Sequence, residues 1–95
     1  MTEAGAGRRI DKWLWCARQF RSRSAASTFV ETQGVRVRRG ALTIRVDKSA
    51  YLLTIGDEIS FSLNDRIIVI RVTGFKPRRG SATEAASLFQ RIEAL

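Results

Sequence analysis

The first part of the chain has apolar residues at helical spacing. Residues 9–20 carry an apolar stripe that recurs every three or four positions, which predicts an amphipathic helix. This stripe consists of Ile10, Trp13, Leu14, Ala17 and Phe20. Trp15 lies on the opposite side of the same helix, among basic residues. We therefore expect a first helix with one unusual aromatic side chain on its polar face.

A second helix is expected directly after the first. Ser22 is a suitable N-cap, the residues of 23–33 repeat apolar side chains at helical spacing, and Gly34 follows where a left-handed backbone ends a helix. Two short helices joined by so few residues form an αα-hairpin. Arg21 and Arg23 lie at its corner.

The spacing of apolar residues then changes to every second position, which is typical of strands. It predicts strands over 35–38, 42–46, 59–63 and 67–72, with turns at Arg39-Gly40, Gly56-Asp57 and Asn64-Asp65. In the first two strands the valines alternate with Arg36, Arg38 and Arg45, so we expect these arginines on one face. The last strand is apolar at nearly every position, so we expect it to be central and covered on both faces.

The end of the chain predicts a third helix. Residues 76–80 form a basic linker, and Ser81 and Glu84 fit a capping box. Apolar residues then follow at helical spacing: Ala85, Leu88, Phe89, Ile92 and Leu95. The whole pattern indicates an α+β domain with an αα-hairpin, a small and mostly antiparallel β-sheet, and a C-terminal helix. We expect a flexible tail over 1–7, a folded body over 9–73, and the linker and helix over 74–95.

The composition excludes several kinds of chemistry. The chain has 95 residues, enough for one core, and contains one cysteine and no histidine. A Cys–His dyad, a Cys/His zinc cage and an internal disulfide are therefore excluded. No apolar run approaches the roughly 20 residues that span a bilayer, and residues 1–7 have the features of neither a signal nor a transit peptide. We expect a non-enzymatic protein without cofactors or metals, in the reducing cytoplasm.

Positive charge is concentrated in the first half of the chain. The net charge is +8, and residues 8–48 carry eleven basic and three acidic side chains, against six and five in residues 49–95. Fourteen of the 17 basic residues are arginine, whose planar guanidinium binds phosphate through two hydrogen bonds. This asymmetry favours a docking face for a polyanion, although an arginine-rich solvated surface is the alternative.

Segments of the first helix and of the start of the second resemble a known protein family. The segments Arg9–Trp15, Ala17-Arg18, Phe20 and Ser22–Ser24 resemble the opening of the bacterial ribosome-associated heat-shock proteins of about fifteen kilodaltons, a single-domain size class. That family is built on the S-four RNA-binding domain, first described in a small-subunit ribosomal protein. The likeness covers roughly residues 9–73, and Arg78–Gly80 with Leu88-Phe89 resembles the family's end.

Two segments depart from the family pattern. Val37 is followed by Arg38-Arg39-Gly40 where the family has Val-Asn-Gly, and the segment from Gly40 to Lys48 is longer. The family's Lys-Pro-Ser is replaced by Lys48-Ser49-Ala50. The changes in the first hairpin add positive charge.

The resemblance implies binding to structured ribosomal RNA of the large subunit, and a role in rescuing large subunits that still carry a nascent chain. We expect phosphate or base contacts from ten residues, with neither a membrane nor a small molecule as partner. They are Arg9, Lys12, Trp15, Arg18, Arg21, Arg23, Arg36, Arg38, Arg39 and Lys48. Trp15 either stacks on a base or is covered by the C-terminal helix. Arg78 and Arg79 form either a second contact or a solvated linker.

Other functional classes remain open at this point. S-four domains also occur in RNA-modifying enzymes, but only about one helix follows residue 73, and a catalytic constellation is missing from the pattern. The two helices also fit a DNA-binding helix-turn-helix protein. The basic charge alone fits binding to an anionic membrane. The RNA hypothesis requires that the cations of the helical hairpin and of the strands share one surface.

Overall fold

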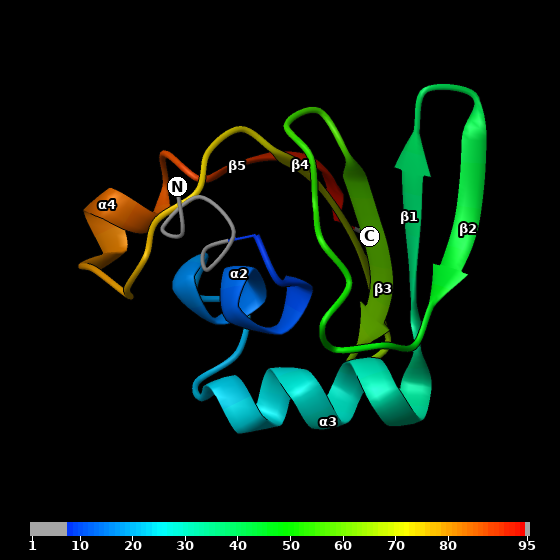
Figure 1. The fold of residues 1–95 in the computed structure, drawn as a ribbon, viewed down its shortest axis with the longest axis horizontal. Coiled ribbons are helices and arrows are strands. Elements are labelled where there is room, and N and C mark those ends of the chain that lie inside the picture. Colours follow the sequence, from blue (N-terminus) through cyan, green and yellow to red (C-terminus); the bar gives the residue numbers. More distant parts are fainter. Residues whose placement is uncertain (1–7, 95) are drawn as a thin grey trace.

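The computed structural model describes residues 8–94, so the tail expected over residues 1–7 lies outside the described residues. The elements, in chain order, are α2 (Ile10–Cys16), α3 (Arg23–Gln33), β1 (Val35–Arg39), β2 (Leu42–Val46), β3 (Glu58–Leu63), β4 (Arg66–Val72), α4 (Ala82–Ala85) and β5 (Phe89–Ala94). The strands form one antiparallel sheet in the order β2-β1-β3-β4-β5. In Figure 1, α2 lies beside β3, and α3 runs past the lower ends of β1 and β3. The predicted α+β class is confirmed.

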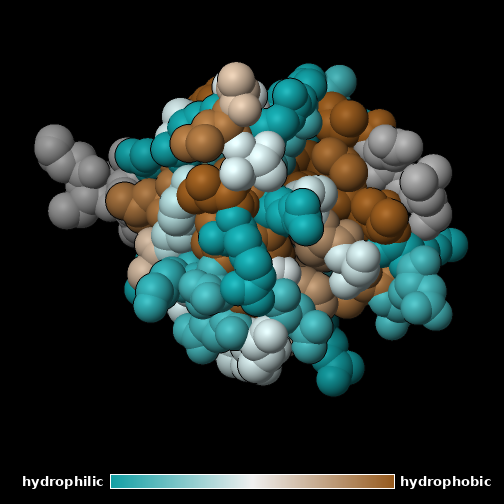
Figure 2. Space-filling view, turned by 90° about the vertical axis from the view of Figure 1, so that its right-hand side faces the viewer, coloured by the Kyte–Doolittle hydropathy of each residue, from teal (hydrophilic) through white to brown (hydrophobic). Residues whose placement is uncertain are grey.

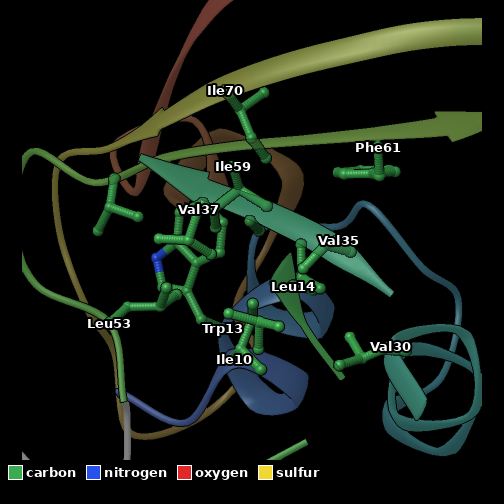
Figure 3. Packing of buried hydrophobic residues seen from close by; sticks show 14 of the residues in the cluster. Ile10, Trp13, Leu14, Val30, Val35, Val37, Leu53, Ile59, Phe61 and Ile70 are labelled. Carbon is green, nitrogen blue, oxygen red and sulfur yellow. The ribbon is translucent and has the colours of Figure 1, made fainter. Parts of the chain in front are cut away.

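The core lies between the helices and one face of the sheet. Alternate strand residues, among them Val35, Val37 and Ile59, are buried against the apolar stripe of α2. Figure 3 shows these side chains converging with Trp13 and Leu14. The Trp13 indole N–H donates to the Gly74 carbonyl oxygen at 2.9 Å, so the buried ring also holds the chain after β4.

The first helix is shorter than predicted. It ends at Cys16 because Arg18 adopts a left-handed backbone, with φ of 62°. The Arg18 N–H donates to the Trp15 carbonyl and the Gln19 N–H to the Leu14 carbonyl, which together form a Schellman ending. Glycine usually occupies that position, so a sequence with arginine there carries no stop signal.

The second helix and the turns follow the prediction. The Ser22 hydroxyl accepts from the Ala25 N–H at 3.0 Å, and Gly34 ends α3 with φ of 77°. Asn64 and Asp65 both have positive φ, as a two-residue hairpin of the primed type requires. Gly40 turns the first hairpin with φ of 63°. These are local signals, and the fold retains them.

The prediction of a C-terminal helix is wrong beyond the first turn of that helix. The capping box of Ser81 and Glu84 is present, but α4 spans only Ala82–Ala85. Residues Phe89–Ala94 instead form β5, which pairs antiparallel with β4. This segment forms a strand despite the helical spacing of its apolar residues. Pairing with β4 satisfies backbone groups on an edge of β4 that would otherwise have no partner.

The prediction that the strand over 67–72 is covered on both faces is also wrong. Ile70 and Val72 are buried, whereas Ile67 on the opposite face is 48% exposed. β4 is interior in the strand order, but in the described part of the chain the helices cover only the Ile70 side. We call the uncovered side the open face of the sheet.

Candidate nucleic-acid interface

Four cations gather around the end of α2. Burial raises the pKa of the Cys16 thiol, and the positive charges of Lys12, Arg79, Arg23 and Lys76 act against this shift. Direct contacts hold three of them: Arg79 donates to the Trp15 carbonyl, Arg23 lies 3.5 Å from the Asp11 carboxylate, and Lys76 lies 3.9 Å from that of Glu84. These four residues come from α2, α3 and the linker after β4. We name them the α2 cation cluster. Lys76 and Arg79 were absent from the expected site, because only the folded linker brings them here.

Asp11 is the acidic residue that joins this region to the N-terminal end of α2. Its carboxylate accepts from Arg9 at 3.1–3.2 Å and lies 3.5 Å from the Arg23 Nε. Asp11 is 3% exposed, whereas both arginines are about two-fifths exposed. The carboxylate therefore holds two guanidiniums at the surface and compensates one of their charges. Both remain accessible to a phosphate.

Trp15 lies under the linker rather than under a helix. The Arg79 guanidinium lies over its ring, 5.6 Å from the centroid, and the Arg79 Nε donates to the Trp15 carbonyl at 3.1 Å. Arg18 donates to the Gly80 carbonyl at 3.0 Å. The half-buried indole also packs against the core. The linker expected to be either solvated or a second contact thus places Arg79 directly at the α2 surface.

The strand arginines lie on the open face. Arg36 pairs in register with Arg45, which confirms that they share a face, and Arg38 follows two residues along β1. Val35 and Val37 point the other way, into the core. Figure 2, which looks onto the β1–β2 side of the molecule, shows hydrophilic side chains interleaved with hydrophobic ones.

Glu58 organises one row of this face. Its carboxylate accepts from Arg38 and from Arg71, each at 2.7 Å, and Arg71 also donates to the Gln90 amide oxygen. The hydrogen bonds from Arg38 and then from Arg71 lower the pKa of Glu58. Two arginines sharing one carboxylate leave this row with positive charge. Arg71 was missed because it sits in an apolar strand, although its register position indicates the open face.

Arg39 and Lys48 occupy different surroundings. The Arg39 guanidinium is bound at 2.8 Å through two hydrogen bonds to Asp57, on the helix side of the sheet, and also lies 5.7 Å from the Tyr51 ring centroid. The hydrogen bond to Asp57 raises the pKa of Arg39. Lys48 is exposed in the segment that follows β2.

The structure therefore divides the ten expected residues between two surfaces, so the single shared surface that the sequence predicts is not present and the RNA hypothesis rests on the group around α2. One group lies around α2 and the corner of the helical hairpin: Arg9, Lys12, Trp15, Arg18, Arg21 and Arg23. Arg36 and Arg38 lie on the open face, and Arg39 is engaged by Asp57. The two surfaces are connected along α3, whose first residue is Arg23 and whose end leads into β1.

These features define a small α+β domain with a helical hairpin on one face of an antiparallel sheet and cations on both sides of it. No family model matches the chain. Among curated proteins it is similar to a protein of Haemophilus influenzae named heat shock protein 15 homolog, with 27% identity over 86 residues. This match covers 90% of the chain but 62% of that relative, so the chain spans about three-fifths of the relative's length.

The chain is also similar to a solved structure from the same group of heat-shock proteins. The chain is similar to the trimeric structure of heat shock protein 15 from Vibrio cholerae, with a TM-score of 0.73 and 28% identity. The match covers 90% of this chain and 82% of that chain. The predicted resemblance to this heat-shock family is confirmed. Among residues 8–94, no helix has the length and apolar character to cross a membrane.

Proposed function

We propose that this protein is a non-catalytic RNA-binding protein of the cytoplasm that acts on structured ribosomal RNA of the large subunit. The observation that carries this proposal is the α2 cation cluster. Its four cations come from three separate segments. Arg79 is held against Trp15 by a hydrogen bond and a ring contact, Arg23 pairs with Asp11, and Lys76 pairs with Glu84. Such a concentration of positive charge attracts the phosphate backbone of a folded nucleic acid.

Different side chains of the interface fit different contacts with RNA. Lys12, Arg21 and Arg23 present charges at the surface and fit phosphate contacts, which position a protein without reading sequence. Selectivity for folded RNA then comes from its shape and from unpaired bases. Trp15 offers such a base only the part of its ring that Arg79 leaves free.

Salt dependence tests the electrostatic part of the proposal. If roughly six phosphates are neutralised, the logarithm of RNA affinity falls with the logarithm of salt concentration with a slope of several units. A competition at fixed salt, with structured RNA against duplex DNA and against anionic vesicles, separates RNA binding from the DNA-binding and membrane-binding alternatives. A flat salt response, or stronger binding to DNA, contradicts the proposal.

The heat-shock role is proposed on the similarity to the two relatives, whose names contain it. We propose that the protein assists large ribosomal subunits that carry a nascent chain after stress. Crosslinking in cells, followed by sequencing of the bound RNA, tests this directly. Enrichment of large-subunit RNA is expected, and enrichment of messenger or transfer RNA would overturn the ribosomal assignment.

A further inference from the structure

A hollow of about 400 Å³ lies where α3 ends and β1 separates from β3. β1 pairs with β3 only from Arg36↔Ser60 to Arg38↔Glu58, whereas β3 continues to Leu63. Within the described residues, the last three residues of β3 therefore pair with β4 alone. The hollow occupies the gap that this divergence leaves. We call it the junction hollow.

One side of the junction hollow is cationic and polar. Arg36 and Arg45 line it together with the hydroxyls of Ser60 and Ser62. Arg36 forms no ion pair with any residue that the structure describes, whereas Arg45 lies 3.2 Å from the exposed carboxylate of Asp47. Arg36 is thus the guanidinium most available to an incoming anion.

Arg45 is placed at the hollow by the shape of the backbone. Its guanidinium donates to the Gln33 carbonyl at 3.4 Å, at the end of α3. A Cβ added to Gly34 would meet that guanidinium at 2.7 Å, and Gly34 also has φ of 77°. Glycine at this position both turns the chain into β1 and leaves room for the arginine. The cation is therefore built into the junction of helix and sheet.

The other side of the junction hollow is apolar. Phe29 is only partly buried, and Phe61, which is 6% exposed, packs behind it with ring centroids 5.7 Å apart and against Phe20 at 5.9 Å. Ile67 adds an aliphatic side chain that is 48% exposed. An aromatic wall beside guanidinium and hydroxyl groups fits a nucleobase with its attached phosphate.

A second hollow of about 540 Å³ extends along α3 toward its beginning. It shares Phe29 and Gln33 with the junction hollow and ends at Arg21. Between these ends it is lined by Ser24 and Thr28. The two hollows thus adjoin at Phe29 and Gln33. Together we call them the groove along α3, which leads from the corner of the helical hairpin toward the arginines of the open face.

We propose that the junction hollow binds one unpaired nucleotide of an RNA, with its base against Phe29 and its phosphate on Arg36. The RNA strand then continues along α3 toward Arg21. This inference rests on the proposed RNA-binding function and deepens it, because it names single-stranded RNA beside a folded element as the ligand. It also explains how cations on two sides of the sheet serve one ligand.

The test uses two RNAs with the full-length protein. The first is a hairpin with the fluorescent base 2-aminopurine in its loop, and the second is the same stem as a fully paired duplex. Arg36→Ala removes the phosphate contact, and Ser62→Phe fills the hollow from the exposed side of β3. We expect each variant to bind the loop RNA about tenfold more weakly, with little change for the duplex.

Arg91→Ala is the matched control, because it removes the same charge from an exposed position on β5, at the other edge of the sheet. It should retain the loop preference and the change in 2-aminopurine fluorescence. Circular dichroism confirms that the variants are folded. Arg36→Ala creates no buried change, so it decides the test if Ser62→Phe fails to fold.

Three results overturn the inference, and each has a different meaning. If both variants keep the loop preference while Lys12→Ala weakens every RNA, the hollow is not the base site and the proposed function stands. If adenosine monophosphate or an acidic peptide binds as tightly as the loop RNA, the hollow serves that ligand instead. If the wild-type protein binds neither RNA, the proposed function fails and the inference fails with it.

Discussion

The guanidinium of Arg39 binds the carboxylate of Asp57 through two parallel hydrogen bonds, both 2.8 Å long. Asp57 is 1% exposed and also accepts from the Thr54 N–H, whereas the Arg39 side chain is 48% exposed. The pair ties the end of β1 to the segment before β3. Arg39 therefore stabilises the fold, whereas its place in a run of basic residues predicted an RNA contact.

Removing Arg39 should destabilise the fold. Arg39→Ala leaves a carboxylate buried without its charged partner, and we expect a loss of about 3 kcal/mol in the free energy of unfolding. Urea unfolding measures this loss. Arg38→Ala is the control, since its carboxylate partner Glu58 is 14% exposed and keeps the hydrogen bond from Arg71, so the loss should stay below about 1 kcal/mol. Equal losses for the two variants would contradict the structural role.

Local signals explain which parts of the fold were predictable. The Ser22 cap, the Gly34 ending and the alternation in β1 act within a few residues, so the sequence alone indicates them. β5 depends on a free edge of β4 some twenty residues away in sequence. Helical spacing in that segment was misleading because strand pairing across this distance leaves no local pattern.

The candidate site was predictable to a similar extent. The alternation of residues 35–46 correctly places Arg36 and Arg45 on one face. It did not indicate that this face lies away from α2, because strand alternation defines two faces without saying which the helices cover. The position of Arg79 over Trp15 depends on how the linker folds back, for which the sequence carries no short-range signal.

Glu58 should make stability depend on acidic pH. Its pKa is lowered in the folded state from 4.5, first by the hydrogen bond from Arg38 and then by that from Arg71. The unfolded chain therefore binds a proton more readily, so the stabilisation is complete above pH 4.5 and is lost as pH falls through the lower folded value. Unfolding by urea at a series of pH values measures this.

Two variants isolate that contribution. Glu58→Gln removes the titrating group, so its difference in unfolding free energy from the wild type should shrink as the pH falls below 4.5. Arg38→Ala removes the larger cause of the lowered pKa and should weaken the same acid dependence. Wild-type and Glu58→Gln curves that remain parallel over this range would show that Glu58 does not contribute.

The left-handed backbone at Arg18 can be tested by substitution. Its φ of 62° is a left-handed conformation that costs an L-residue roughly 1 kcal/mol, which glycine avoids. Because glycine also loses more backbone entropy on folding, we expect Arg18→Gly to unfold at the same temperature or a few degrees higher. Arg18→Val should unfold at a lower temperature, since a β-branched residue tolerates this conformation poorly. A lower melting temperature for glycine than for valine would contradict the Schellman ending.

Arg21 and Arg23 should differ although they lie two residues apart. Arg21 is exposed and, among the described residues, has no acidic partner within ion-pair distance, so Arg21→Ala should leave the unfolding free energy nearly unchanged. Arg23 lies 3.5 Å from the buried carboxylate of Asp11, so Arg23→Ala should lower the unfolding free energy by about 1 kcal/mol. The loss stays small because Arg9 still binds the Asp11 carboxylate.

The same two variants should weaken RNA binding to a similar degree, because each removes one cation from the helical hairpin. Each is expected to reduce the slope of log affinity against log salt by about one unit. Urea unfolding and RNA titration on the same preparations compare the two effects. If Arg21→Ala leaves both affinity and salt slope unchanged, the corner of the hairpin does not contact RNA, and the groove along α3 loses its proposed end.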